Sequence, residues 1–242
     1  MRAQADEFVV VIDPGHGGKD PGTLGSASHE KDITLAVSLE LGRILKANLP
    51  GVKVVYTRTT DKFVELYRRA ELANEQRADL FISIHCNSMP HGTASRAAIQ
   101  GTEIYVMGLH KSEDNLEVAQ RENAAILKEA NYQANYEGFD PNSPQSYILL
   151  SLRQQAYLEN SLNLARKINQ EFVERVKRPS RGVKQAGFVV LSRTTMPSVL
   201  IELGFLSSPA EEKYLKEAAH QVYLASAIFR AIRAYKAEIE AP

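Results

Sequence analysis

The 242-residue chain contains one cysteine and carries no net charge, and each of these features excludes a class of protein. Because Cys86 has no second cysteine to pair with, the chain cannot be a disulfide-stabilised scaffold. Lys plus Arg and Asp plus Glu both number 29, so the sequence predicts no strong electrostatic attraction to nucleic acid or to an anionic membrane. No run of about 18 or more apolar residues occurs, so we expect no membrane-spanning helix.

The rest of the composition is that of a globular protein. Hydrophobic residues make up 44% of the chain and charged residues 24%, and this length fits one large domain whose core needs no metal or disulfide for folding. Near the N-terminus, Ala3-Gln4-Ala5 resembles the A-x-A end of a secretory signal, although no apolar segment precedes it. The sequence leaves open whether the chain begins near a cleavage point or with an ordinary polar leader.

Short β-branched, apolar runs alternate with helical patterns along the chain. The runs that predict strands are Phe8–Ile12, Val52–Tyr56, Leu80–Ile84, Glu103–Val106, Phe188–Leu191 and Val199–Ile201. Apolar residues recur at helical spacing in Glu30–Asn48, Phe63–Gln76, Tyr147–Val176 and Pro209–Ile239. This alternation predicts a single α/β domain, residues 1–242, with a mainly parallel, twisted sheet of about six strands and helices on both faces.

One segment interrupts this alternation. Roughly 80 residues separate the expected strands Glu103–Val106 and Phe188–Leu191, which is more than one crossover helix requires. The segment contains a polar helix, Glu113–Ala130, with a thin apolar stripe, and a turn-rich stretch that begins at Tyr136. We therefore expect a helical insertion, over about residues 111–146, that adds something to the core fold.

Chemically reactive side chains follow the ends of several expected strands. His16 follows the first strand through a glycine-rich turn, and His85 and Glu202 end the third and the last. Because ligands bind beyond the carboxyl ends of strands in open α/β sheets, we expect these three residues to converge. Glu30 lies in the first turn of the next helix, seven residues before Val37, so both side chains face the sheet. A carboxylate aimed inward needs a partner, and a cation supplies one.

Two histidines and a carboxylate form the ligand set of a catalytic zinc, and a second carboxylate is what such a zinc needs beside its water. The set therefore predicts a metallohydrolase. Each residue alone has a simpler interpretation: His85 as a satisfied core histidine, and Glu202 as a capped or ion-paired carboxylate. The glycine-rich turn invites comparison with phosphate-binding loops, but its spacing matches neither G-x-G-x-x-G nor a Walker loop.

Longer motifs carry a family resemblance, and they run in order from about Phe8 to Leu215. They are Ile12-Asp-Pro-Gly-His-Gly-Gly-Lys-Asp-Pro-Gly, Glu30, Arg69-x-x-x-Ala73-Asn74, Ser83-Ile-His-x-Asn87, Arg181-Gly-Val-Lys and Met196-Pro-Ser-Val-Leu-Ile-Glu-Leu-Gly-Phe-Leu-Ser. In these motifs the sequence resembles the zinc-dependent N-acetylmuramoyl-L-alanine amidases of the type 3 family, which includes the AmiA/AmiB/AmiC-like cell-wall amidases.

The resemblance implies one zinc ion per chain, bound by His16, Glu30 and His85, with Glu202 as the catalytic carboxylate. It implies hydrolysis of the peptidoglycan amide between N-acetylmuramic acid and L-alanine, for cell-wall remodelling or daughter-cell separation, in the periplasm or outside the cell. Zinc would lower the pKa of its water to about 7, and Glu202 would move that water's proton to the leaving nitrogen. Asn87 and Arg69 would orient ligands or substrate, or serve only as a turn asparagine and a surface or core-pairing arginine.

The insertion resembles the regulatory segment of the AmiB/AmiC-like members, in which a helix covers the zinc site and a glutamate blocks the metal. Arg121-Glu122-Asn123 stands where that glutamate is expected. We therefore predict that Glu122 binds zinc or its water in the resting enzyme, and that an activator protein displaces the helix. Glu117 and Glu129, on neighbouring helix faces, are the rivals for this role, and an ordinary exposed glutamate is the alternative.

Two other functions stay open at this point. A zinc carboxypeptidase or endopeptidase acting on stem peptides would use a similar ligand set. A cell-wall binding module with a structural zinc is an alternative from another class, but structural sites are closed by four protein ligands, whereas three and one acid converge here. Among the other histidines, His29 rivals Glu30 as a ligand, and His91, His110 and His220 lack converging partners.

Overall fold

The computed structural model describes residues 7–90, 92–110, 112–141, 143–151 and 156–241. Its centre is a six-stranded sheet in the order β2-β1-β3-β6-β4-β5. The strands are β1 (Phe8–Pro14), β2 (Val52–Tyr56), β3 (Leu80–Asn87), β4 (Thr102–Met107), β5 (Ser180–Ala186) and β6 (Ser198–Phe205). Neighbouring strands are parallel except β4 and β6, which are antiparallel. The predicted mainly parallel sheet of six strands is therefore confirmed.

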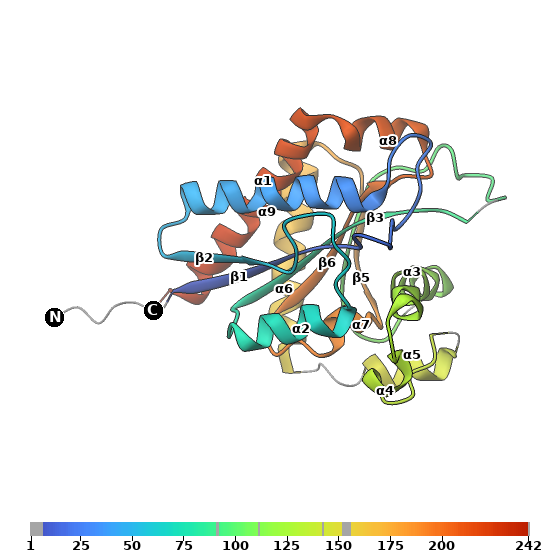
Figure 1. The fold of residues 1–242 in the computed structure, drawn as a ribbon. Coiled ribbons are helices and arrows are strands. Elements are labelled where there is room, and N and C mark those ends of the chain that lie inside the picture. The colour runs from blue at the N-terminus through green and yellow to red at the C-terminus, as the bar shows by residue number, and fades with distance from the viewer. Residues whose placement is uncertain (1–6, 91, 111, 142, 152–155, 242) are drawn as a thin grey trace.

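Helices cover both faces of this sheet, as the sequence predicts (Figure 1). The helices on one face are α1 (Glu30–Asn48), α6 (Leu158–Glu171) and α9 (Ala218–Ile239). Those on the other face are α2 (Leu66–Glu75), α3 (Glu113–Asn123), α5 (Pro144–Ser151) and α7 (Val189–Ser192). Because side chains alternate along a strand, Val10 and Ile12 of β1 pack into the α1 side while Val9 and Val11 pack into the α2 side.

The insertion forms a group of short helices at the lower right of Figure 1. After β4 the chain builds α3, the 3-10 turn Ala124–Lys128, α4 (Tyr132–Asn135) and α5. Ser112 caps α3, since its hydroxyl oxygen accepts a hydrogen bond from the amide of Asn115 at 3.4 Å. Of the predicted apolar stripe, Ala119 and Ile126 are buried in the same core as α2 and Leu116 packs against it, whereas Leu127 is exposed. Val118, which was not predicted as part of the stripe, is also buried there. Lys111, at the edge of the expected insertion, lies outside the described residues.

One predicted strand is wrong. Phe188–Leu191 does not form a strand, because Val189–Ser192 is the short helix α7, and the strand that pairs with β4 is β5, which begins eight residues earlier. A short, fully buried apolar run fits a strand or a helix turn equally well by its pattern. The true strand lies at the sheet edge and is mostly half-exposed, so its sequence, Ser-Arg-Gly-Val-Lys-Gln-Ala, carries almost no apolar signal.

Several helix boundaries also differ from the expected ones. The stretch Tyr147–Val176 is divided, because α5 ends at Ser151, α6 begins at Leu158 and Phe172–Val176 form a π-helical turn; residues 152–155 lie outside the described part. Pro209–Ile239 is two helices, α8 (Pro209–Lys216) and α9, separated by an extended residue at position 217. The boundary carries no glycine or proline, so the sequence pattern continues through it.

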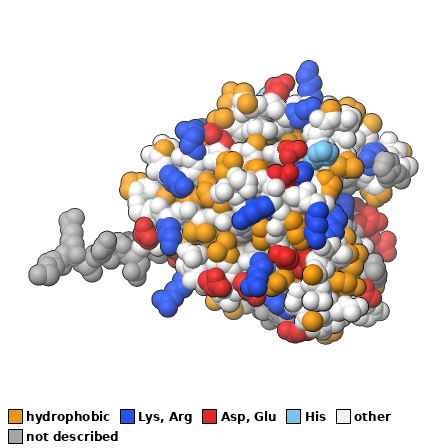
Figure 2. Space-filling view, viewed as in Figure 1, with side chains coloured by type: hydrophobic (Ala, Val, Ile, Leu, Met, Phe, Trp, Pro, Cys, Tyr) orange, Lys and Arg blue, Asp and Glu red, His pale blue; other side chains and the backbone are white. Residues whose placement is uncertain are grey.

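Charges of both signs are interspersed on the face of the molecule seen in Figure 2. This mixture agrees with the equal numbers of acidic and basic residues in the chain. None of the helices in the described residues is long and apolar enough to cross a bilayer. Ala3-Gln4-Ala5 and His91 lie outside the described residues.

Candidate metal centre

The loop that follows β1 presents His16 in an unusual backbone conformation. His16 has a φ of 61°, in the left-handed region that non-glycine residues rarely adopt. Two buried arginines hold this conformation by donating to the carbonyl oxygens of the loop. Arg58 donates to Pro14 and Gly15, and Arg69 donates to Pro14 and His16, all at 2.8–3.0 Å. The loop carbonyls are therefore satisfied without water, and the imidazole is fixed before any ligand binds.

Asp13, near the end of β1, forms an ion pair with Arg69. Its carboxylate accepts hydrogen bonds from Arg69 at 2.8 Å, from Thr57 at 2.6 Å and from Ser83 of β3 at 2.7 Å. Burial opposes ionisation of this carboxyl, but the Arg69 guanidinium and the two hydroxyl donors lower its pKa. Arg69 is thus a buried residue that shapes the His16 loop rather than a surface residue.

His85 and Glu30 approach His16 from β3 and from the first turn of α1. Glu30 Oε1 lies 3.1 Å from His85 Nδ1 and 3.1 Å from His16 Nε2, and it accepts a hydrogen bond from the Cys86 amide at 2.8 Å. Its other oxygen accepts from the Thr23 amide at 2.8 Å. A side chain on Gly15 would collide with the His85 ring at 2.5–2.8 Å, so the glycine is what allows this close approach.

Glu122 of α3 completes the group. Its Oε2 lies 2.9 Å from His85 Nδ1 and 3.1 Å from His16 Nε2. One ligand atom from each of His16, Glu30, His85 and Glu122 therefore lies within 4.8 Å of the others, and all four residues are buried. The structure brings the three predicted zinc ligands together with the one predicted insertion glutamate.

The geometry of this group fits a shared divalent metal. A tetrahedral zinc with bonds of about 2.0–2.1 Å separates neighbouring ligand atoms by about 3.3 Å, close to the distances seen here. His16 Nε2 and Glu122 Oε2 are both buried and 3.1 Å apart, yet within the described residues neither makes a hydrogen bond. Polar atoms that crowd together without hydrogen-bonding are what a central cation would explain.

The ionisation of the group supports the same conclusion. Burial alone would lower the pKa of His85, but the negative charges of Glu122 and Glu30 outweigh it and raise that pKa to about 9. Burial would raise the pKa of Glu30, but His16 outweighs it and lowers that pKa to about 2. Without a metal, the raised pKa values of His16 and His85 and the lowered pKa values of Glu30 and Glu122 favour two protonated histidines beside two carboxylates. One dication would replace those two protons with the same total charge.

Asp20 connects His16 to the insertion, a role that was not predicted from the sequence. Its Oδ2 lies 2.8 Å from His16 Nδ1, so it orients the ring whose other nitrogen faces the group. Its Oδ1 accepts from Lys128, which belongs to the insertion, at 2.5 Å. The signal available was spacing: Asp20 stands four residues after His16 in the glycine-rich motif.

Glu202 lies beside the metal group without belonging to it. In the pairing of β3 with β6 it is the register partner of His85, so both side chains leave the same face of the sheet. Both of its carboxylate oxygens are buried and lack a hydrogen-bond partner among the described residues. Burial and the nearby charge of Glu122 raise the pKa of this carboxyl well above its usual value. Such an unsatisfied carboxyl beside a metal group is a candidate proton carrier.

Arg121 ties α3 to the core next to Glu122. Its guanidinium donates to Asn87 Oδ1 at 2.6 Å and to the Ser88 carbonyl at 3.1 Å, and its Nε donates to Glu122 Oε1 at 3.3 Å. Asn87 in turn donates to Glu103 Oε2 at 2.7 Å. Asn87 therefore contacts the insertion and a buried carboxylate, and it does not touch the metal group directly.

The other candidates lie elsewhere. Glu117 is exposed on α3, and Glu129 accepts from the Leu66 amide and from the Tyr136 hydroxyl, away from the metal group. His29 is 54% exposed and faces Asp32 at 3.5 Å. Within the described residues, only Glu122 among the predicted insertion glutamates reaches the two histidines.

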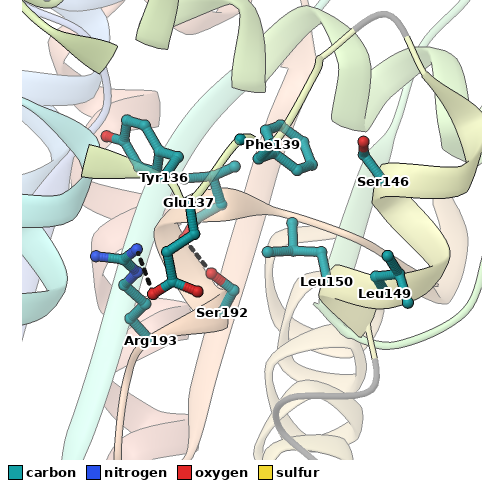
Figure 3. A pocket seen from close by; sticks show the side chains of 10 residues that line it. Tyr136, Glu137, Phe139, Ser146, Leu149, Leu150, Ser192 and Arg193 are labelled. Carbon is teal, nitrogen blue, oxygen red and sulfur yellow. Dashed lines mark hydrogen bonds and ion pairs between the residues drawn. The ribbon is translucent and has the colours of Figure 1, made fainter. Parts of the chain in front are cut away.

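Several cavities lie along the insertion. A cleft of about 200 Å³ leads to the metal group, with His16, Asp20 and Glu30 on one wall and Glu122 and Lys128 on the other. A second pocket, of about 120 Å³, lies where the turn after α4 and α5 pack on α7 (Figure 3). Figure 3 shows Tyr136 and Phe139 on one side of this pocket and an ion pair of 3.6 Å between Glu137 and Arg193. The interface between the insertion and the core is therefore not fully packed.

Comparison with known proteins places this architecture in one family. A family model described as N-acetylmuramoyl-L-alanine amidase matches residues 10–234. The chain is 34% identical to N-acetylmuramoyl-L-alanine amidase AmiA of Escherichia coli (strain K12) over 94% of its length and 75% of that protein. Among solved structures, the N-acetylmuramoyl-L-alanine amidase of Clostridium difficile 630 has a TM-score of 0.71 and 28% identity, covering 98% of this chain and 100% of that one. The CwlD amidase of Clostridioides difficile, solved in complex with the GerS lipoprotein, has a TM-score of 0.68 and 25% identity, covering 96% and 99%.

Proposed function

The chain belongs to the N-acetylmuramoyl-L-alanine amidase family, and from this premise we propose that it is a zinc-dependent, autoinhibited hydrolase of peptidoglycan. The bond it would cleave is the amide between N-acetylmuramic acid and the L-alanine of the stem peptide. The observation that carries the zinc proposal is the convergence of four buried ligand atoms within 4.8 Å. An enzyme of this family acts on cell-wall material, which supports a place outside the cytoplasm, either periplasmic or secreted.

His16, Glu30 and His85 would hold the zinc. Asp20 fixes the ring of His16, and the Thr23 and Cys86 amides fix the carboxylate of Glu30, so these ligands are held in place by hydrogen bonds. When bound, zinc supplies Lewis-acid activation of water and of the amide carbonyl.

Glu202 would act as the general base and then the general acid. Its two free oxygens lie beside His85 across the β3–β6 pairing. Once Glu122, whose charge helps to raise the pKa of Glu202, has moved away, they can take a proton from the attacking water. The same carboxyl can then return this proton to the nitrogen of the departing L-alanine. Because it makes no other hydrogen bond among the described residues, nothing competes with this transfer.

Glu122 would inhibit this site. It occupies the position of a fourth ligand, where substrate would otherwise approach, and Arg121 and Lys128 clamp its helix to Asn87 and Asp20. These clamps are polar contacts between side chains at the cleft, which a competing surface can replace. A protein partner that draws α3 away would then expose the metal, and the CwlD–GerS complex shows that one similar amidase does assemble with a second protein.

A product assay tests the amidase proposal. The purified chain is incubated with peptidoglycan, and the released peptides are examined for an intact stem with a free L-alanine amine. We expect this product, its loss when zinc is removed with a chelator, and its return when zinc is restored. A truncated stem peptide would instead indicate the rival carboxypeptidase or endopeptidase. Binding to the wall without any turnover, also after Glu122→Ala, would indicate a binding module and contradict the proposal.

A further inference from the structure

A β-bulge in β5 brings two cations to one face of the sheet. Between β4 and β5 the register advances by two residues from Thr102 to Ile104, but by three residues from Ser180 to Val183. Gly182 is one of the two residues between Ser180 and Val183, and its φ of 93° is a conformation that favours glycine. In a regular strand Arg181 would share the face of Val183. The bulge turns it to the face of Lys184 instead.

Both cations converge on Glu103 of β4. Its Oε1 accepts from Arg181 Nε at 2.9 Å and from Lys184 Nζ at 2.6 Å, and its Oε2 accepts from Asn87 and from the Tyr105 hydroxyl. Burial opposes ionisation of Glu103, but Lys184 and Arg181 lower its pKa, so it stays charged. One carboxylate and two cations leave a net charge of +1 at this place.

Arg181 and Lys184 lie on the same face of the sheet as the proposed catalytic residues His85 and Glu202. Glu103 is the register partner of Glu202 in the antiparallel pairing of β4 with β6, and Glu202 is the register partner of His85. Successive strands therefore present His85, Glu202, Glu103 and then the two cations on one face. At about 4.8 Å per strand, the strand that carries the cations lies about 10 Å from the strand of Glu202, and their charged groups reach Glu103 on the strand between.

Arg181 has hydrogen-bonding capacity to spare. Only its Nε makes a hydrogen bond to another described residue, so the two terminal nitrogens are left to form a bidentate pair with an incoming carboxylate. The Phe205 ring lies 5.4 Å from the guanidinium and holds it flat. The Arg181 side chain is 39% exposed, so a ligand can reach it.

The insertion covers this place in the resting structure. The space above the pair is only about 50 Å³, and α3 closes it with Asp114, Glu117 and Arg121. A volume of that size holds one or two water molecules and no peptide. Two of the residues that line this space from α3, Asp114 and Glu117, are acidic.

We propose that Arg181 and Lys184 form a subsite for a carboxylate of the stem peptide, on the leaving-group side of the scissile amide. The inference rests on the proposed amidase function. An extended peptide advances about 3.3–3.5 Å per residue, so a span of about 10 Å places the second or third stem residue over the pair. The pair selects stems that carry a free carboxylate there over stems in which it is amidated.

Two synthetic N-acetylmuramoyl tripeptides test the subsite, one with free carboxyl groups on the second and third residues and one with those groups amidated. The full chain carrying Glu122→Ala serves as the reference. We expect it to prefer the acidic compound by about tenfold to a hundredfold in kcat/KM, mainly through KM, because charge-assisted hydrogen bonds are worth that much. Adding Arg181→Gln should raise KM for the acidic compound far more than for the amidated one and so remove the preference, and Arg181→Lys should keep part of it.

Controls separate the subsite from a structural role. Arg43→Gln removes an exposed arginine that pairs only with Glu40, and it should leave the preference intact. Zinc content and the melting temperature of each variant show whether it folds. If Arg181→Gln does not fold, Lys184→Gln takes its place as the test of the subsite. Equal loss of turnover on both compounds, or no preference in the reference chain, overturns the subsite alone. Failure of the reference chain to hydrolyse either compound overturns the proposed amidase function and the subsite with it.

Discussion

The two walls of the catalytic cleft are built differently. On the sheet wall, His16, Glu30 and His85 come from elements whose backbones are buried, and amides or buried arginines hold the His16 loop and Glu30. On the insertion wall, Glu122 stands on an eleven-residue helix that is attached by side-chain contacts, while Leu127, Ile148 and Leu149 of the insertion are exposed. The rigid sheet wall suits the proposed metal ligands, which must keep their geometry. The insertion wall suits Glu122, which must move away before substrate can bind.

The difference between the walls has an energetic basis. Removing a sheet-wall residue leaves buried partners unsatisfied, which costs about 1–3 kcal/mol for each group. The contacts of Arg121 and Lys128 lie at the cleft, where both side chains are 30–42% exposed, so water can replace them at a smaller cost. Breaking these two polar contacts therefore requires less free energy than distorting the group formed by His16, Glu30 and His85.

The strongest test of the sheet wall is Glu202→Gln. The substitution keeps the shape of the side chain and removes its ability to accept a proton. We expect kcat to fall by about 10²- to 10⁴-fold, the usual contribution of a general acid–base group. Metal analysis should still find one zinc per chain, because Glu202 is not among the ligands. Turnover that survives the substitution would remove Glu202 from the mechanism.

The matching test of the insertion wall is Glu122→Ala. Loss of a buried, charge-assisted contact shifts the closed–open equilibrium by about tenfold to a hundredfold, so hydrolysis of peptidoglycan should rise by that factor. Glu113→Ala is the matched control, since it removes an exposed glutamate nine residues earlier on the same helix and should change little. Equal rates for the two variants would show that Glu122 does not block the site.

The smallest expected effect is at Asp20, where the two walls meet. Asp20→Asn keeps an oxygen near His16 Nδ1 but loses the charge that orients the ring, so zinc affinity should fall by about tenfold. Competition with a chromogenic chelator measures this affinity. Lys128→Met removes only the partner of Asp20 on the insertion wall and should leave zinc affinity unchanged or slightly higher. If Lys128→Met weakens zinc as much as Asp20→Asn does, the ligand set depends on the insertion and the walls are not separate.

Much of the fold follows from local sequence. The boundaries of β2 and α1 agree with the predicted Val52–Tyr56 and Glu30–Asn48, because their apolar patterns end where the elements end. β5 could not be predicted, since an edge strand buries few side chains and its Arg-Gly-Val-Lys stretch follows a bulge rather than an alternation. The apolar run Phe188–Leu191 misled for the opposite reason, because burial alone does not distinguish a strand from a helix turn.

For the site, local sequence was enough to identify the candidate side chains: strand-end positions indicated His16, His85 and Glu202, and helix phase indicated Glu30. Which residues surround them depends on the packing of distant segments. This packing placed Glu122 rather than Glu117 or Glu129 on the two histidines and paired Asp20 with Lys128. It also set Arg181 and Lys184 on the same face of the sheet as His85 and Glu202. Strand ends and helix phase are local properties of the chain, whereas contacts between an insertion and a sheet depend on how distant segments pack, and no local pattern encodes that packing.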